Sequence, residues 1–363
     1  MNGINEALSW WDVGIFFIGV MFAAYLADRG HSKIMTFVTG MILVCVCGLR
    51  HGYIDTRAYR VGFENLELSN VFSLDFLING ESKDRGFSFL SGIIRYFTDN
   101  GQVFLFIMAL ITVLALYYGL INRVPNMTYA VFLFICTGCY LDTMNGLRQA
   151  LASSLLFLIL PNLIIEKKFI KYVLVIAILS TVHASALVFI PLYFIAIQKP
   201  WTRITGLFSV CVLLIFAFFN TGIGDILVEF LDGTSYGQDY SEMLLAGNTS
   251  VNVVRVFVSL VPVLLSFFYR NDKKNFPMYN IAFNFSLINA FTWIFATKVF
   301  YFYRLAMYFQ PYMILLLCYE MFYLNKEPEN KIFKVMSVLL FILWLIYSLH
   351  VMGDIFFVGY LKY

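Results

Sequence analysis

Charged residues are scarce in this chain of 363 residues, at 13% of the sequence against 61% hydrophobic residues. Soluble domains carry about 25% charged residues, so this scarcity excludes an ordinary soluble protein. The composition instead predicts a polytopic membrane protein. The formal net charge is only +3, and such a small excess gives no indication of a nucleic-acid partner.

The sequence also lacks the motifs that usually hold metals or disulfides. It contains no HExxH, no DxD and no convincing His/Cys spacing, so no metal site is expected. Its six cysteines lie inside apolar runs, which argues against a disulfide framework. The CxxC of Cys136 and Cys139 is more typical of small packing residues than of a redox pair. Asp225, Asp232 and Asp239 recur in a Gly-rich segment, where a solvated loop is a simpler interpretation than a cation site.

Long apolar runs dominate what is present, and a membrane-spanning helix needs about 20 such residues. The runs cover residues 10–27, 34–49, 101–121, 129–142, 147–165, 203–222, 251–269, 278–297, 300–323 and 332–352. The region 171–197 is also apolar, but His183 and Pro191 interrupt it. It forms either two short spans or a re-entrant helical hairpin. The sequence therefore predicts an all-α protein with about 10–12 transmembrane helices in one integral membrane domain, residues 1–363.

The distribution of Lys and Arg orients these spans. Basic residues concentrate in short loops that the positive-inside rule places in the cytoplasm, at 28–33, 166–171, 199–203, 270–275 and 325–334. The N-terminus has no Lys or Arg before Arg29 and is then outside. Segments 50–100 and 223–250 fall on the outer side. The first is too apolar for disorder, so we expect short amphipathic helices at the outer surface, with 86–98 the best candidate.

Several cations lie in apolar surroundings on this outer side, where Lys and Arg are normally sparse. They are Arg50, Arg148, Arg255, Arg304 and His183. Each one alone has an ordinary explanation, such as snorkelling to the headgroups, pairing between helices or packing. Together they place positive charge from separate helices at one membrane face, which favours an anion-binding site. The guanidinium fork suits phosphate because it is bidentate and stays charged at low dielectric.

The residues around these cations suggest local geometry. If the stretch after Arg50 is helical, His51 and Asp55 are neighbours on one face, although an ordinary helix end is the alternative. Arg148 begins a long apolar helix, where an anion would gain from the arginine and from free N–H groups. Helical spacing puts Asn145 and Ala152 on the same face as Arg148.

The remaining cations are less well defined by their neighbours. His183 has Ser180, Thr181 and Ser185 close in sequence, so it is either a packing residue or a general base or phosphate donor. Arg255 lies one turn into the span after an acidic outer segment. Arg304 lies near the outer start of its span, with Lys298 close by.

These residues resemble the EpsG-like branch of the Wzy-type polysaccharide polymerases, which includes O-antigen and capsule repeat-unit polymerases. The resemblance spans most of the chain. Two departures are a Gly-Tyr-Ile-Asp where the family usually shows Gly-Thr-Asp, and Asp84-Arg85 where it usually has an acid and Pro. The matching pieces occur in the family's order, as Arg50, Gly52, Asp55 and Tyr59, then Gly86-Phe87, then Asn145, Arg148, Gln149 and Ala152, then His183 and Ser185, then Arg304 with Tyr308 and Phe309.

The resemblance implies a type-C glycosyltransferase-like helical fold in the bacterial inner membrane. Such enzymes join undecaprenyl-pyrophosphate-linked oligosaccharide repeat units, which are both donor and acceptor, on the periplasmic or outer face. The growing glycan is transferred to a new lipid-linked unit, and undecaprenyl pyrophosphate is the leaving group. No cofactor, nucleotide sugar or metal is expected. Whether chain length is set here or by a chain-length regulator stays open.

The hypothesis for the site follows from the charges that this reaction develops. We assign Arg148 and Arg304 to the pyrophosphate with Arg255 assisting, and we place His183 or Asp55 near the acceptor hydroxyl. Further candidates for substrate binding are Arg50, His51, Tyr59 and Asn145. Three alternatives stay open, namely a flippase or transporter for the lipid-linked glycan, an O-antigen ligase with a different acceptor, and an acyltransferase with His183 as base.

Overall fold

The structure is a computed structural model that describes residues 10–73, 84–219, 251–269, 276–299, 302–324 and 330–351. Throughout these ranges the chain is built from helices and the turns between them, with no strand. Four helices are long and apolar enough to cross a membrane, namely Trp11–Gly30, Gly101–Ile121, Leu147–Ile165 and Phe302–Phe322. Shorter apolar helices accompany them. The prediction of an all-α polytopic membrane protein is confirmed, whereas segment 223–250 lies outside the described residues.

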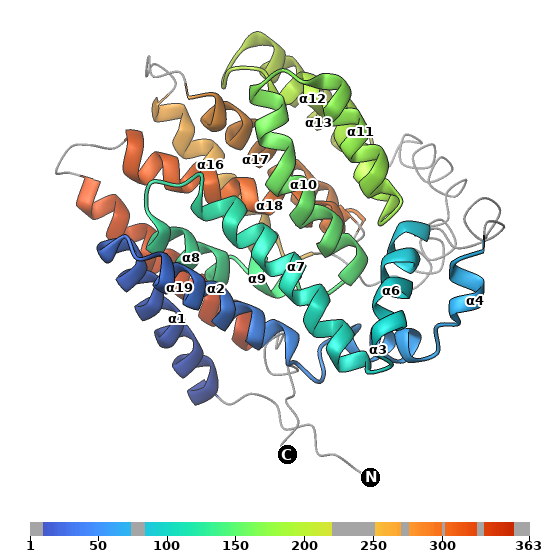
Figure 1. The fold of residues 1–363 in the computed structure, drawn as a ribbon. Coiled ribbons are helices and arrows are strands. Elements are labelled where there is room, and N and C mark those ends of the chain that lie inside the picture. Colours follow the sequence, from blue (N-terminus) through green and yellow to red (C-terminus); the bar gives the residue numbers. More distant parts are fainter. Residues whose placement is uncertain are drawn as a thin grey trace.

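Each apolar run that the sequence predicts contains a helix (Figure 1). In the first half these are α1 (Trp10–Gly30), α2 (Lys33–Gly48), α7 (Gly101–Ile121), α8 (Met127–Cys136), α9 (Cys139–Asp142) and α10 (Leu147–Ile165). In the second half they are α13 (Arg203–Ala217), α16 (Val253–Ser266), α17 (Pro277–Ala296), α18 (Phe302–Tyr319) and α19 (Asn330–Val351). The run predicted over 129–142 divides into α8 and α9 at Gly138, whose φ of +84° suits glycine.

Helices α17 and α18 form the centre of the bundle, and nearly all of their side chains are buried. Aromatic rings fill the space between them, with Phe285 and Tyr312 having ring centroids 4.5 Å apart. Helix α10 packs against this pair through Phe157, whose ring centroid is 5.0 Å from that of Tyr312. This packing fixes the start of α10 relative to the start of α18, as the contacts at the site show below.

The region 171–197 is an antiparallel pair of short helices, an arrangement that both two short spans and a re-entrant hairpin would have. Helix α11 (Phe169–Ser180) runs to a turn at His183, and η1 (Ala184–Val188) and α12 (Phe189–Ala196) return. Tyr172 in the first turn of α11 has its ring centroid 5.1 Å from that of Tyr193 near the end of α12. The Tyr172 hydroxyl also donates to the Phe189 carbonyl at 2.6 Å. The tip of the hairpin, with His183, therefore lies at the opposite end from Tyr172.

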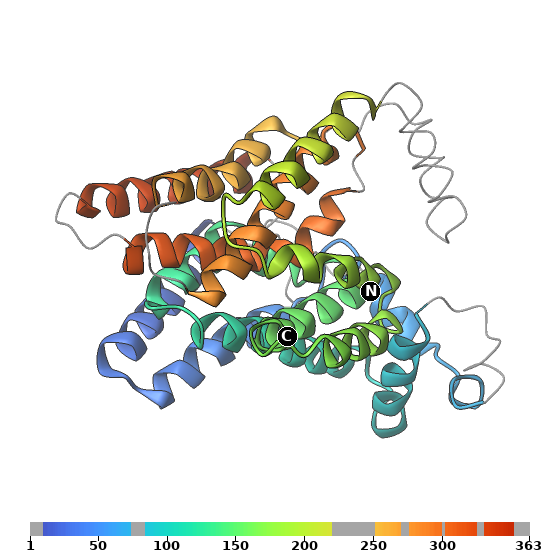
Figure 2. The same cartoon turned by 90° about the horizontal axis from the view of Figure 1, so that it is seen from above.

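Segment 50–100 contains the short helices that its composition predicts, α3 (Thr56–Glu64), α4 (Leu68–Val71) and α6 (Arg85–Phe97). They gather beside one side of the bundle (Figures 1 and 2). The helix predicted over 86–98 is confirmed as α6. Phe63 of α3 stacks on Phe104 of α7 with ring centroids 4.2 Å apart, and Phe87 of α6 packs on the same ring.

Several helix ends meet at one end of the bundle, which we call the Arg148 end. The Gln102 side chain near the start of α7 donates to the Gly48 carbonyl at the end of α2 at 2.7 Å. The Gln149 side chain near the start of α10 donates to the Arg304 carbonyl near the start of α18 at 2.5 Å. Gly86 N–H near the start of α6 donates to the Thr181 carbonyl at the hairpin tip at 2.8 Å. Separate parts of the sequence thus converge on the first turn of α10.

Candidate functional site

Arg148 extends from the first turn of α10, and the turn before it sets its direction. Gly146 precedes the helix with φ +58°, a conformation that glycine adopts without a Cβ clash. Its N–H donates to the Asp55 carboxylate at 3.3 Å, so the residue before α3 is tied to the start of α10. Because α10 begins at Leu147, Asn145 is outside the helix. The predicted shared helical face is therefore wrong for Asn145, whereas Arg148 and Ala152 both lie in α10 and share a face.

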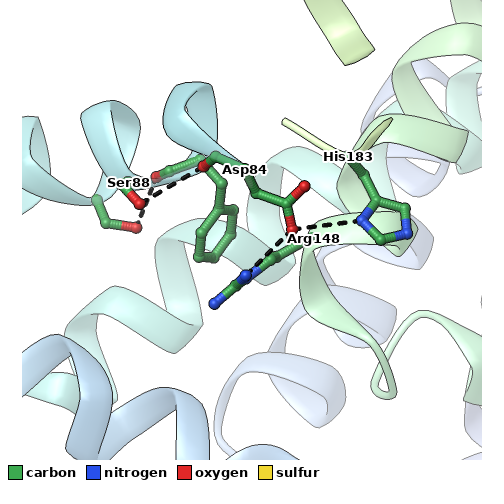
Figure 3. A network of polar contacts seen from close by, with 6 residues as sticks. Asp84, Ser88, Arg148 and His183 are labelled. Atoms are coloured by element: carbon green, nitrogen blue, oxygen red, sulfur yellow. Dashed lines mark hydrogen bonds and ion pairs between the residues drawn. The ribbon is translucent and has the colours of Figure 1, made fainter. Parts of the chain in front are cut away.

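The carboxylate of Asp84 connects Arg148 to His183 (Figure 3). Its Oδ2 lies 3.1 Å from Arg148 Nη1 and 3.5 Å from His183 Nδ1. The Asp84 side chain is 6% exposed and the His183 side chain 11%, whereas that of Arg148 is 44% exposed. These three residues, the Asp84–Arg148–His183 cluster, come from the start of α6, the start of α10 and the hairpin tip. One carboxylate oxygen thus joins three separate elements.

Two opposed effects act on the pKa of Asp84. Burial favours the neutral acid and raises the pKa, whereas hydrogen bonds from His183 and Arg148 and their charges lower it. The second group wins, and the pKa of Asp84 lies below its ordinary value. The residue is therefore a carboxylate at neutral pH. Its other oxygen, Oδ1, is buried and has no hydrogen-bond partner in the described part of the chain.

The start of α6 is held tightly against the hairpin tip, which positions Asp84. A Cβ on Gly86 would lie 2.1 Å from Thr181 Oγ1 and 2.9 Å from the Thr181 carbonyl carbon, so only glycine allows this approach. Ser88 N–H donates to the Asp84 carbonyl at 3.1 Å and continues the helix from there. This close approach explains why glycine stands at position 86, before Phe87.

Aromatic rings flank the guanidinium of Arg148. Its carbon lies 5.3 Å from the ring centre of Phe87 and 6.0 Å from that of Tyr59, within the range of cation–π attraction. Burial raises the pKa of the Tyr59 hydroxyl, and the charges of Arg148 and Arg304 partly offset that effect. Tyr59 is therefore a neutral hydroxyl at physiological pH, close to both arginines.

The start of α18 brings Arg304 to the same end of the bundle. Its carbonyl accepts from the Gln149 side chain, and Tyr308 one turn later shares a hydrogen bond with Ser185 at 2.9 Å. In the His-x-Ser motif, Ser185 thus contacts α18 and His183 contacts Asp84. This arrangement brings the elements that carry Arg148, His183, Ser185 and Arg304 to one end of the bundle.

Arg50 has a different environment from the one that the sequence analysis gave it. Its side chain is fully buried. The guanidinium donates to the Cys47 carbonyl at 2.6 Å, to Thr56 Oγ1 at 3.0 Å and to the Met144 carbonyl at 3.2 Å. These partners fix the turn from α2 to α3 and the approach to α10. The structure therefore gives Arg50 a positioning role, with its donors directed at the protein.

His51 and Asp55 do not share a helical face, because residues 51–55 form a turn and α3 begins at Thr56. The condition for the predicted i,i+4 pair, a helical stretch after Arg50, is therefore not met. Arg60 Nη1 lies 2.9 Å from His51 Nδ1. Burial and the charge of Arg60 lower the pKa of His51, so the imidazole is neutral at pH 7. The Asp55 carboxylate accepts a hydrogen bond from the Gly146 N–H.

Arg255 of α16 lies in a separate small environment. Its guanidinium carbon is 5.2 Å from the ring centre of Trp293. Together with Thr137, Ser259 and Gln310 it lines a cavity of about 30 Å³, large enough for one water. No group of three His, Cys, Asp or Glu residues converges anywhere in the described ranges. The groups at the Arg148 end are guanidinium, imidazole and hydroxyl groups beside the carboxylates of Asp84 and Asp55.

Asp84 is the principal site residue that the sequence analysis did not select. Its signal was present, because an acid stands just before Gly86-Phe87 at the start of a predicted amphipathic helix. The sequence analysis mentions Asp84 only because Arg85 follows it where the family usually has Pro. The partner of that acid is 64 residues away in sequence, at Arg148.

The fold and the cluster define a polytopic membrane protein with a charged site where helix ends meet. The EpsG family model matches residues 33–363, nearly the whole chain, and the protein belongs to the EpsG family. This is a Wzy-like family of polysaccharide polymerases, so the chain has a polymerase-like, glycosyltransferase-like role in polysaccharide biosynthesis. No curated protein and no solved structure matches the chain.

Proposed function

We propose that this protein polymerises undecaprenyl-pyrophosphate-linked oligosaccharide repeat units on the outer face of the bacterial inner membrane, with its N-terminus outside. The family assignment supports the polymerase class, and the distribution of Lys and Arg supports the orientation. The observation that carries the site assignment is the shared contact of Asp84 Oδ2 with Arg148 and His183. Donor and acceptor are both lipid-linked, and the type-C glycosyltransferase likeness belongs to the same proposal.

The reaction requires stabilisation of a leaving pyrophosphate. The acceptor hydroxyl oxygen forms a bond to the anomeric carbon of the growing glycan, and the bond from that carbon to the pyrophosphate oxygen breaks. The pyrophosphate leaves with the electron pair. Arg148 meets this charge with its exposed guanidinium, beside the N-terminus of α10, where the helix dipole is positive. Arg304 adds a second cation from the start of α18.

The acceptor hydroxyl must lose its proton as the new bond forms. His183 is the base in our proposal, because imidazole is a common general base and the Asp84 carboxylate faces its Nδ1. Asp84 then stabilises the imidazolium and fixes the ring. Asp55 is less suited to this role, because its carboxylate holds the Gly146 N–H. Tyr59 and Phe87 shield the site beside Arg148.

A reconstituted assay tests this proposal. Purified protein in vesicles is given lipid-linked repeat units, and polymer length and released polyprenyl pyrophosphate are measured. Arg148→Ala should abolish both products, whereas Arg57→Ala, on the exposed side of α3, should retain them. Arg148→Lys should restore only about 1–10% of the rate, because the bidentate fork is lost. Polymer of normal length from Arg148→Ala would refute the assignment.

A further inference from the structure

A second site lies at the other end of the bundle. Asp28 at the end of α1 contacts Asn126 before α8 at 2.7 Å, and α2 leads from that end to the Arg148 end. The 16 residues of α2 correspond to about 24 Å. Helices α1, α8 and α19 lie near one another (Figure 1). Beside Asp28 their side chains line a groove of about 610 Å³. We call it the α1–α8–α19 groove, and its apolar walls include Met21, Phe132 and Val338.

The mouth of the groove has an exposed apolar rim. Tyr25 and Leu339 line it and are 43% and 54% exposed. The neighbouring surfaces of α1 and α19 are apolar and exposed, as shown by Phe22 at 62% and Leu343 at 65%. In a protein that spans a membrane, such surfaces face lipid. The apolar rim of the groove therefore suits an acyl chain.

The polar edge of the groove is positively charged. The Asp28 carboxylate accepts from the Asn126 side chain at 2.7 Å, from Thr128 Oγ1 at 3.2 Å and from Met127 N–H at 3.3 Å. Arg29 donates to the Tyr25 hydroxyl, and Lys334 Nζ lies 4.4 Å from the ring centre of Phe322. Within the described ranges neither cation forms an ion pair. The Asp28 carboxylate thus accepts hydrogen bonds from neutral donors. Arg29 and Lys334 can therefore contact an anion.

We propose that the α1–α8–α19 groove binds an anionic phospholipid. An acyl chain lies along the apolar walls, and the phosphate contacts Arg29 and Lys334 at the edge. In the orientation that the charge pattern predicts, this is the cytoplasmic leaflet, where basic residues attract anionic headgroups. The site is separate from the pyrophosphate site in function and position, since it lies at the opposite end of α2.

Native mass spectrometry of the purified full chain tests this site. The protein is titrated with phosphatidylglycerol and with phosphatidylcholine of the same acyl chains. Each cation should favour the anionic lipid about fivefold, so Arg29→Gln with Lys334→Gln should remove most of the preference. The matched control is Lys33→Gln with Lys171→Gln, which removes the same charge at this end from exposed positions outside the groove. The control should keep the preference.

A second variant tests the acyl-chain contact. Val338→Trp fills the groove and should weaken binding of both phospholipids at least severalfold, with unchanged elution of the folded protein as the check. Equal binding of the two lipids by the wild type, or an unchanged preference in the double Gln variant, would overturn the proposal. Unaltered binding by Val338→Trp would also overturn it. So would displacement of phosphatidylglycerol by an equimolar polyprenyl phosphate, which would make the groove part of the substrate path.

Discussion

Asp84 has an unusual position among the residues of the site, because it occupies the space that an anionic ligand would take. Its carboxylate neutralises Arg148 while the side chain itself is 6% exposed. A pyrophosphate that approaches Arg148 must compete with it or share the guanidinium. The exposed part of Arg148 makes sharing the simpler arrangement, because a guanidinium has donors on several edges. Asp84 then holds the arginine and the histidine in place while substrate binds.

The depressed pKa of Asp84 predicts an acid-dependent loss of stability. Hydrogen bonds and charges from His183 and Arg148 stabilise the carboxylate in the folded state. This contribution is present above the unfolded pKa of about 3.9 and is lost as the pH falls through the lower folded value. Because Arg148 is 44% exposed, we expect about 1 kcal/mol. Thermal unfolding in detergent between about pH 2.5 and 6 should show this loss in the wild type and a flatter curve in Asp84→Asn, and identical curves would contradict it.

His183 is predicted to act on the proton rather than on donor binding. His183→Ala should lower the polymerisation rate by about 10²–10⁴, the usual effect of losing a general base, with little change in the binding of the lipid-linked donor. Asp55→Asn keeps an acceptor for Gly146 N–H and should retain most of the rate. Single-turnover rates and donor binding, measured in parallel, separate the two roles. A larger loss in Asp55→Asn than in His183→Ala would assign the base to Asp55 instead.

At the scale of the elements, the contact between α6 and the hairpin tip controls the geometry of the cluster. Asp84 lies at the start of α6, and His183 lies at the turn between α11 and η1. Their carboxylate and imidazole meet because Gly86 lets the backbone of α6 approach Thr181. The sequence of neither element shows that the two meet, because the contact joins segments that are far apart in the chain.

Gly86→Ala is predicted to separate these elements. The new Cβ would lie 2.1 Å from Thr181 Oγ1 and 2.9 Å from its carbonyl carbon, so α6 must shift and carry Asp84 away from His183. Polymerisation should fall at least tenfold, as expected when catalytic groups are displaced by about 1 Å. Gly62→Ala on α3 is the matched control, since no atom lies within 4 Å of its Cβ, and it should retain full activity. Equal activity of the two variants would show that the contact is unimportant.

At the scale of the whole molecule, the sequence was sufficient for the membrane class and for the helices. Hydropathy follows from each residue and its neighbours, so the apolar runs and the helix over 86–98 could be predicted locally. The cations were also visible, because an arginine in an apolar run stands out. Their partners were not, because Arg50 turns toward the Met144 carbonyl, 94 residues away, and Asp84 toward Arg148. Only the fold shows which of these cations have hydrogen-bond partners within the protein.

The size distribution of surface glycan tests the central claim most directly. A strain that lacks the gene receives either the wild type, Arg148→Ala or the exposed-surface control Arg57→Ala, and its glycan is separated by size on a gel. We predict a full ladder from the wild type and from Arg57→Ala, and single repeat units without the ladder from Arg148→Ala. If Arg148→Ala instead loses all surface glycan and accumulates lipid-linked units inside the cell, the protein is a flippase and the proposed polymerase function is contradicted.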